Sequence, residues 1–208
     1  MDEEDVPSPI DLKKMSDAQE WARNAMQRPF RQDFFEAFRK ELTKLNYASI
    51  RVLELGSGPG FLAEYLLTNL PTLMISLLDN SPSMHRLAKK QLHKHLQRVK
   101  FIERDFKQPN WNEDLGRFDA VVTLQAVHEL RHKRYATDFH RQVRPLLGNN
   151  GVYLFCDHYF GHEGMQNDQL YMSNAEQRQS LKNAGFSYSE VLNRGGRALY
   201  YAIHKIST

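Results

Sequence analysis

Short apolar segments alternate with amphipathic ones over most of this chain, and no other feature constrains its fold as strongly. The segments suited to buried strands are IRVLEL (50–55), LMISLLD (73–79), VKFIERD (99–105), FDAVVTLQ (118–125) and GVYLFCD (151–157). Stretches with helical periodicity separate most of them. Strands that alternate with helices pair in parallel, because each helix carries the chain back across the sheet. We therefore expect an α/β fold: a doubly wound, mostly parallel sheet with helices on both faces.

Capping and turn residues predict several element boundaries. Ser81, which precedes a proline, is expected to cap one helix. Asn174 and Gly185 are expected to begin and end the last helix. The segment 186–205 contains two strand-like stretches joined by a Gly-Gly pair, which predicts a terminal hairpin and one antiparallel strand.

The length of 208 residues suits a single domain. We expect disorder over about residues 1–10, a helical cap over 11–46 and the main core over 50–205. The acidic start lacks the apolar core of a signal peptide, and no apolar run is long enough to span a bilayer, so we expect a cytoplasmic protein. One cysteine, Cys156, excludes an internal disulfide framework and a cysteine-based zinc site.

A net charge of +3 is too small to indicate a nucleic-acid-binding protein. Most of the local excess lies in residues 85–100, where Leu87, Leu92 and Leu96 recur at roughly helical spacing. We expect one face of a helix there to pack inward and the cations to point outward. A solvated helix face is the favoured interpretation, and a surface that binds a polyanion such as RNA is the alternative.

Polar side chains stand where the expected strands end. In an open parallel sheet, ligands bind beyond the carboxyl ends of the strands. Carboxylates are expected there at Glu54, Asp79 and Asp105, and again at Asp157 beside His158. This set of hydrogen-bond acceptors predicts a ligand site at that edge of the sheet.

The turn Gly56-x-Gly58-x-Gly60 follows the first strand and is one residue shorter than the dinucleotide-binding fingerprint. Backbone N–H groups near Gly58, and the start of the next helix, favour a small anion such as a carboxylate. Glu54 would repel a pyrophosphate but attract an ammonium group. A ligand that carries both a carboxylate and an ammonium group is an amino acid.

The next two strand ends suit an adenosine. Asp79 lies about 20 residues beyond the glycine turn and can accept hydrogen bonds from a ribose diol. Asp105 can accept from an exocyclic amine, and the backbone N–H of Phe106 can donate to a ring nitrogen. An amino acid joined to adenosine is S-adenosylmethionine, which we predict as the cofactor.

The chain at this point resembles the class I S-adenosylmethionine-dependent methyltransferases. The resemblance covers about residues 50–205 and rests on VLELGSGPG, LLDNS, ERDF, FDAVVTLQAVHEL, LLGNNGVYLF and AGF. It implies the strand order 3-2-1-4-5-7-6, with strand seven antiparallel. It also implies cofactor contacts from the first strand and its turn, and from the ends of strands two, three and four. These residues are Glu54, Gly56, Ser57, Gly58 and Gly60 at the methionine moiety, Asp79, Asn80 and Met84 at the ribose and adenosine, Asp105 and Phe106 at adenine, and Leu124 and Gln125 near the sulfonium.

Methyl transfer needs alignment, and a base when the acceptor carries a proton. The principal candidates for that base are His128 and His158, because histidine titrates near neutral pH. Glu129, Asp157, His162 and Glu163 are weaker candidates. We expect no metal, because metal-dependent catechol methyltransferases place acids after strands four and five, and strand four here ends in Gln125.

Several substrate classes lack their expected signatures. No (Asn/Asp)-Pro-Pro-(Tyr/Phe) run follows strand four, and Cys156 lies inside a strand rather than in a Pro-Cys pair. We therefore expect an enzyme that methylates oxygen or nitrogen of a small molecule. An RNA methyltransferase and a non-catalytic S-adenosylmethionine-binding subunit are the alternatives, and the sequence does not indicate an oligomeric state.

Two segments are expected to build the acceptor pocket. The N-terminal helices supply aromatic residues, Trp21 among them, flanked by Arg28 and Arg31. These arginines could meet a substrate carboxylate or phosphate, or could be plain surface charges. The long insert after strand five supplies Tyr159, Tyr171 and Met172 as further contacts.

Overall fold

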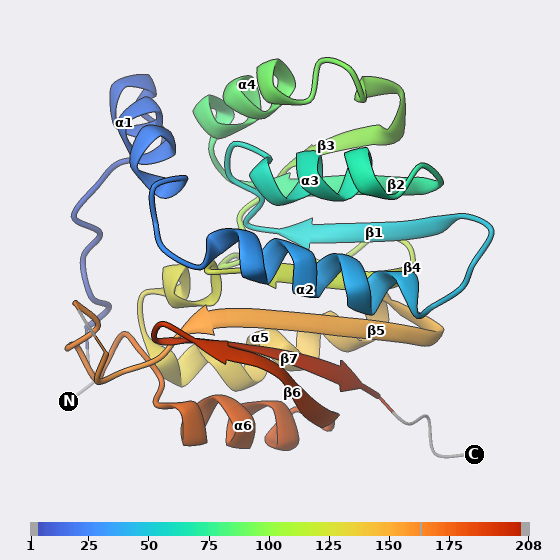
Figure 1. The fold of residues 1–208 in the computed structure, drawn as a ribbon. Coiled ribbons are helices and arrows are strands. Elements are labelled where there is room, and N and C mark those ends of the chain that lie inside the picture. The colour runs from blue at the N-terminus through green and yellow to red at the C-terminus, as the bar shows by residue number, and fades with distance from the viewer. Residues whose placement is uncertain (1–3, 163, 205–208) are drawn as a thin grey trace.

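The computed structural model describes residues 4–162 and 164–204 and has a seven-stranded sheet at its centre (Figure 1). The strand order β3-β2-β1-β4-β5-β7-β6 confirms the predicted order. Strands β1 to β5 pair in parallel, and β7 is antiparallel to both of its neighbours. The strands are β1 Ile50–Leu55, β2 Leu73–Asp79, β3 Val99–Glu103, β4 Phe118–Leu124, β5 Leu147–His158, β6 Ser187–Arg194 and β7 Arg197–Ile203.

Helices cover both faces of the sheet, as the alternating pattern predicts. They are α1 Met15–Ala25, α2 Arg31–Thr43, α3 Phe61–Asn69, α4 Pro82–Gln91, α5 Ala136–Val143 and α6 Asn174–Asn183. Short 3-10 turns occur at η1 Leu96–Arg98, η2 Val127–Leu130, η3 Lys133–Tyr135 and η4 Arg144–Leu146.

Two apolar cores lie on opposite faces of the sheet because neighbouring strand residues point to opposite sides. On one face, Leu154 of β5 packs with residues of α2 and α3. On the other face, Phe155 packs with residues of α5 and α6. In the same way, Phe38 of α2 belongs to the first core and Phe139 of α5 belongs to the second. The face covered by α2 is the one that concerns the site below.

Two helix boundaries differ from those expected. Ser173, rather than Asn174, caps α6: its hydroxyl accepts from the Glu176 N–H, and the Glu176 carboxylate accepts from the Ser173 N–H. This reciprocal pair satisfies two backbone donors, which a lone asparagine could not do. Helix α4 ends at Gln91, so Leu96 lies in a separate turn and is 45% exposed instead of packing inward.

Residues 4–10 were expected to be disordered, whereas the structure places them against the η2 turn. The Val6 N–H donates to the Arg131 carbonyl at 2.9 Å. The Arg131 guanidinium donates in turn to the carbonyls of Val6 and Pro7, at 2.8 and 2.7 Å. Within the described parts of the chain, no helix is both long and apolar enough to cross a membrane.

Candidate functional site

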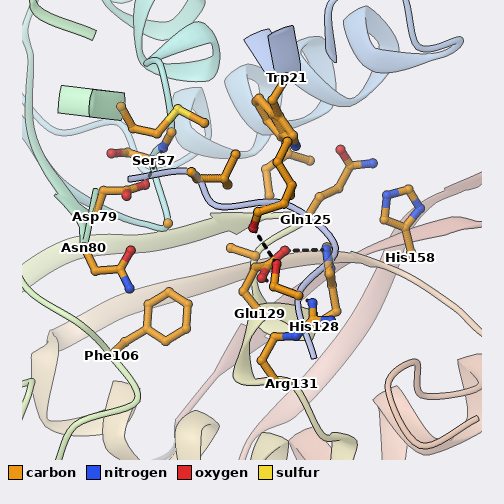
Figure 2. Close-up of a pocket in the computed structure, with 18 of the residues that line it drawn as sticks. Trp21, Ser57, Asp79, Asn80, Phe106, Gln125, His128, Glu129, Arg131 and His158 are labelled. Carbon is orange, nitrogen blue, oxygen red and sulfur yellow. Dashed lines mark hydrogen bonds and ion pairs between the residues drawn. The ribbon is translucent and has the colours of Figure 1, made fainter. Parts of the chain in front are cut away.

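A cavity of about 720 Å³ lies at the carboxyl ends of the strands, bounded by residues of α1, of α2 and of the N-terminal segment (Figure 2). Most of the residues predicted to bind a ligand line it. From the predicted cofactor set these are Glu54, Gly56, Ser57, Gly58, Asp79, Asn80, Met84, Asp105, Phe106, Leu124 and Gln125. From the predicted catalytic and acceptor sets they are His128, His158, Arg28, Arg31 and Tyr171.

The glycine turn follows β1 with backbone angles that favour glycine. Gly56 has φ +67°, and a Cβ there would lie 2.4 Å from the Ala126 Cβ, so the position leaves no room for a side chain. Gly58 also has positive φ, and its N–H donates to Asp79 Oδ2 at 2.8 Å. Asp79 Oδ1 accepts from the Ser81 N–H at 2.9 Å. The turn and the tip of β2 therefore hold each other in place.

Gly60, which was predicted as a ligand contact, is not among the residues that line the cavity. It precedes α3 with φ +78°, and a Cβ there would lie 3.1 Å from Leu92 and 3.3 Å from Ala88. Gly60 therefore lets α3 begin close to the end of α4.

Glu54 is a buried carboxylate that lacks a full set of partners. It is 3% exposed, and its Oε2 has no hydrogen-bond partner among the described residues. Burial raises the pKa of Glu54 to about 8, although the nearby Arg31 guanidinium opposes the shift. Burial also raises the pKa of Asp79. An unsatisfied buried carboxylate beside a cavity is a ready acceptor for a cationic ligand group.

Gln125 and Arg31 contact each other in the wall of the cavity. Gln125 has φ +58°, its N–H donates to the Cys156 carbonyl at 2.7 Å, and its Oε1 accepts from Arg31 Nη1 at 3.1 Å. Arg31 also lies over the Phe35 ring at 5.4 Å. This bond connects the tip of β4 to the start of α2.

His128 is held by Asp157, the last residue but one of β5. The Asp157 Oδ1 lies 2.7 Å from His128 Nδ1, and Oδ2 accepts from the His128 N–H at 2.9 Å. His128 Nε2 lies 3.5 Å from Glu129 Oε1 (Figure 2). Burial works to lower the pKa of His128, but the Asp157 and Glu129 carboxylates outweigh it and the net pKa is raised. The arrangement keeps Nδ1 on Asp157 and leaves Nε2 on the cavity side.

His158 lies next to His128, with 5.7 Å between the ring centroids. The two predicted bases therefore converge on one part of the cavity (Figure 2). Burial, followed by the charges of its neighbours, lowers the pKa of His158 to about 3. His158 is consequently neutral through the physiological range, and its environment differs sharply from that of His128.

Tyr159 and Met172, which were predicted as acceptor contacts, are not among the residues that line this cavity. Tyr159 follows His158 at the end of β5, and its hydroxyl donates to Asn193 Oδ1 at 3.1 Å. Met172 is 7% exposed within the core that contains Phe155. His158 and Tyr171 line the cavity, whereas their chain neighbours Tyr159 and Met172 are held by these other contacts. Glu163 lies outside the described residues.

Among the parts of the cavity wall that the sequence interpretation missed, three bear on the site. Arg197 begins β7, and Arg131 follows η2. The third contribution is the segment 5–13, most of which lines the cavity. Arg197 could have been anticipated, because an antiparallel strand begins at the edge where parallel strands end. The other two depend on contacts between segments more than 100 residues apart. Within the described ranges, no group of three or more histidine, cysteine or acidic side chains is arranged to hold a metal ion.

The N-terminal wall of the cavity gives a first prediction. Arg131→Gln should detach residues 4–10, because it removes two hydrogen bonds to the Val6 and Pro7 carbonyls, each worth roughly 0.5–1.5 kcal/mol. Hydrogen exchange followed by mass spectrometry should show faster exchange at Val6 and little change in β1. The matched control is Arg178→Gln on the exposed side of α6. Equal protection of Val6 in the Arg131 variant and the wild type would contradict the prediction.

Comparison with known families and proteins gives a consistent result. A family described as "Methyltransferase domain" matches residues 52–151. The malonyl-[acyl-carrier protein] O-methyltransferase of Bacillus cereus is 29% identical over 136 residues, a match that covers 65% of this chain and 47% of that protein. This chain thus spans about half the length of that relative. The carboxy-S-adenosyl-L-methionine synthase of Campylobacter hominis is 25% identical, over 68% of this chain and 71% of that protein.

Comparison of structures supports the same fold. An O-methyltransferase family protein from Burkholderia thailandensis superimposes with a TM-score of 0.73 at 19% identity. The match covers 91% of this chain and 60% of that one. The overall fold of this chain is therefore similar to that of the matched part of that protein.

Proposed function

Because this chain belongs to the superfamily of class I S-adenosylmethionine-dependent methyltransferases, we propose that it transfers a methyl group from S-adenosylmethionine to an oxygen or nitrogen of a small molecule. One observation carries the proposal: the carboxylates of Glu54 and Asp79 line one cavity on either side of the positive-φ turn at Gly56 and Gly58. Two hydrogen-bond acceptors on either side of a glycine turn suit a ligand in which an amino acid is joined to a nucleoside.

The residues of the cavity fit that cofactor. The unpartnered Oε2 of Glu54 suits its ammonium group, and the crowded glycine turn lets the backbone approach its amino-acid end closely. Asp79 is held rigidly by two backbone donors and suits the ribose hydroxyls. Met84, Phe106 and Asp105 border the part of the cavity left for adenine. When bound, the cofactor supplies a methyl group already activated on a sulfonium.

His128 is the base that we assign to a protonated acceptor. Its Nδ1–H donates to Asp157, so its Nε2 is the nitrogen free to take a proton from a hydroxyl or ammonium group. Asp157 stabilises the imidazolium that forms, as a positioning residue. His158 lies beside it as a neutral ring and helps to shape the acceptor site.

The RNA alternative is weakened by the way the basic segment 85–100 is used. The Arg98 guanidinium donates to several backbone carbonyls around the end of α3, among them Leu67 at 2.7 Å and Leu70 at 3.0 Å. His85 is buried against the Phe101 ring, and Lys89 lies over the same ring at 5.3 Å. Part of the local charge therefore serves packing and is not offered to a polyanion.

Calorimetry tests the proposed cofactor. The purified protein should bind S-adenosylhomocysteine at one molecule per chain and should prefer it to NAD. Incubation with methyl-labelled S-adenosylmethionine and a metabolite extract should then label a small molecule. A preference for NAD would overturn the proposal. Tight S-adenosylhomocysteine binding without labelling of any small molecule would instead favour a non-catalytic binding subunit.

A further inference from the structure

Three arginines line the cavity on the face of the sheet covered by α2. Arg28 precedes that helix, Arg31 begins it, and Arg197 begins β7. Alternation places Glu54, His158 and Arg197 on this same face, because Val52, Cys156 and Leu199 belong to the core under α2. The cluster is therefore a consequence of how α2 covers the ends of β1, β5 and β7.

Arg197 is the most buried of the three. It is 4% exposed, and its Cα pairs in register with that of His158 across the β5–β7 ladder. The one hydrogen bond described for its guanidinium goes to the Gly195 carbonyl, at 2.9 Å. A guanidinium carries five N–H donors, so most of this group's hydrogen-bonding capacity remains available.

Arg28 is half-buried beside Trp21, with its guanidinium carbon 5.3 Å from the ring centroid. Within the described ranges, no carboxylate lies within 4.0 Å of a nitrogen of Arg28, Arg31 or Arg197. Of the nearby acids, Asp157 binds His128, and Glu54 interacts with Arg31 through its charge without forming an ion pair.

The pKa values of Arg28 and Arg31 indicate that the positive charge of this cluster is not neutralised by its neighbours. Burial lowers the pKa of Arg28, and the charge of Arg197 lowers it further. Burial and then the Arg28 charge lower the pKa of Arg31 to about 10. Buried charges are costly unless they are paired, so such a cluster is expected where a negatively charged ligand completes it.

We infer that Arg28 and Arg197 bind an oxyanion, a carboxylate or a phosphate, on the methyl acceptor. This inference rests on the proposed function, because it places the cofactor over β2, β1 and β4. The next strands along the edge are β5 and β7, where His158 and Arg197 lie. The forked guanidinium matches both oxyanions in geometry and charge. Arg31 contacts Gln125 at the tip of β4, closer to the amino-acid end of the cofactor.

Free anions test the site without knowledge of the acceptor. Protein saturated with S-adenosylhomocysteine should be stabilised against thermal unfolding by malonate or by inorganic phosphate, beyond the effect of chloride at equal ionic strength. Arg28→Gln and Arg197→Gln should each weaken this anion binding roughly tenfold or more, since each removes charge-assisted hydrogen bonds. Malonate acting alone would identify a carboxylate site, and phosphate acting alone a phosphate site.

The controls separate this inference from the proposed function. Arg23→Gln, on the exposed surface of α1, should leave anion binding unchanged. Arg197→Lys keeps the charge at the buried position and should retain part of the binding if Arg197→Gln does not fold. All of these variants should bind S-adenosylhomocysteine within a few-fold of the wild type.

Failure takes distinct forms for the two proposals. Anion binding that is absent, or equal in the wild type and both glutamine variants, would overturn the oxyanion site. Failure of the wild type to bind S-adenosylhomocysteine would overturn the proposed function. The anion titration would then be carried out on the protein without S-adenosylhomocysteine. A labelled methylation product that is not retained by an anion exchanger at neutral pH would also overturn the oxyanion site.

Discussion

Replacing His128 with alanine should lower the rate of methyl transfer by about 10²-fold or more, since a positioned base contributes roughly 10²–10⁴-fold. S-adenosylhomocysteine affinity should stay within a few-fold, because His128 follows β4 and its partner Asp157 lies near the end of β5, away from Asp79 at the tip of β2. The measurement is kcat with the identified acceptor, with calorimetry on the same preparation. Full turnover in the His128→Ala, His158→Ala and double variants would show that no histidine base operates.

The pH profile separates the two histidines. A base acts in its neutral form, so kcat/KM should rise with pH through the raised pKa of His128 and then reach a plateau. Asp157→Asn removes the carboxylate that raises this pKa, whereas burial still lowers it. The midpoint should therefore move to lower pH, and the plateau rate should fall because the correct tautomer is no longer enforced.

His158 is the internal control for this profile. Its pKa is lowered to about 3, so it does not change charge between about pH 5 and 9, and His158→Ala should leave the midpoint in place. An Asp157→Asn profile with an unchanged midpoint would exclude the His128–Asp157 pair as the titrating unit.

Asp79→Ala should weaken S-adenosylhomocysteine binding by roughly 10-fold to 150-fold, which corresponds to about 1.5–3 kcal/mol for hydrogen bonds to a charged group. The loss has two parts: the ribose acceptors disappear, and the Gly58 N–H loses the partner that holds the turn. Calorimetry measures the affinity, and thermal unfolding reports whether the fold survives. Glu113→Ala, at an exposed acid, is the matched control. An unchanged affinity in Asp79→Ala would contradict the placement of the ribose.

Glu54→Gln distinguishes a binding role from a structural one. The pKa of the buried Glu54 is raised to about 8 in the folded protein, against about 4.3 when unfolded, so the stability of the free protein falls as the pH rises from about 4.3 to about 8. The glutamine should therefore leave the free protein equally or more stable at pH 7 while weakening S-adenosylhomocysteine binding. A loss of stability together with unchanged binding would assign Glu54 to the fold.

Local patterns were sufficient to predict much of the fold and of the ligand edge. The alternation of elements predicts the parallel sheet, the family resemblance implies its strand order, and the structure confirms both. The cavity is lined by Glu54, Asp79 and Asp105. These residues lie at or near the ends of strands, and parallel strands bring those ends to one edge of the sheet. Such features depend on short stretches of sequence and on periodicity.

The failures occurred where a side chain's direction or partner depends on distant residues. Tyr159 and Met172 lie next to His158 and Tyr171 in the chain but outside the cavity lining, because Tyr159 bonds to Asn193 and Met172 packs in the core that contains Phe155. Leu96 was placed on a helix that ends at Gln91. A composition typical of disorder gave no sign that Val6 pairs with Arg131.

The sequence by itself determined the parallel sheet, the glycine turn and the acids around it, since these follow from local backbone preference and from the two-residue period of strands. Only the tertiary structure decided that Asp157 holds His128 and that Arg28 and Arg197 share one cavity. Those pairs join segments 29 and 169 residues apart in the chain, at positions set by how helices and strands pack. Which side chains share a site therefore depends on how the helices and the sheet pack against each other, and not on residue type alone.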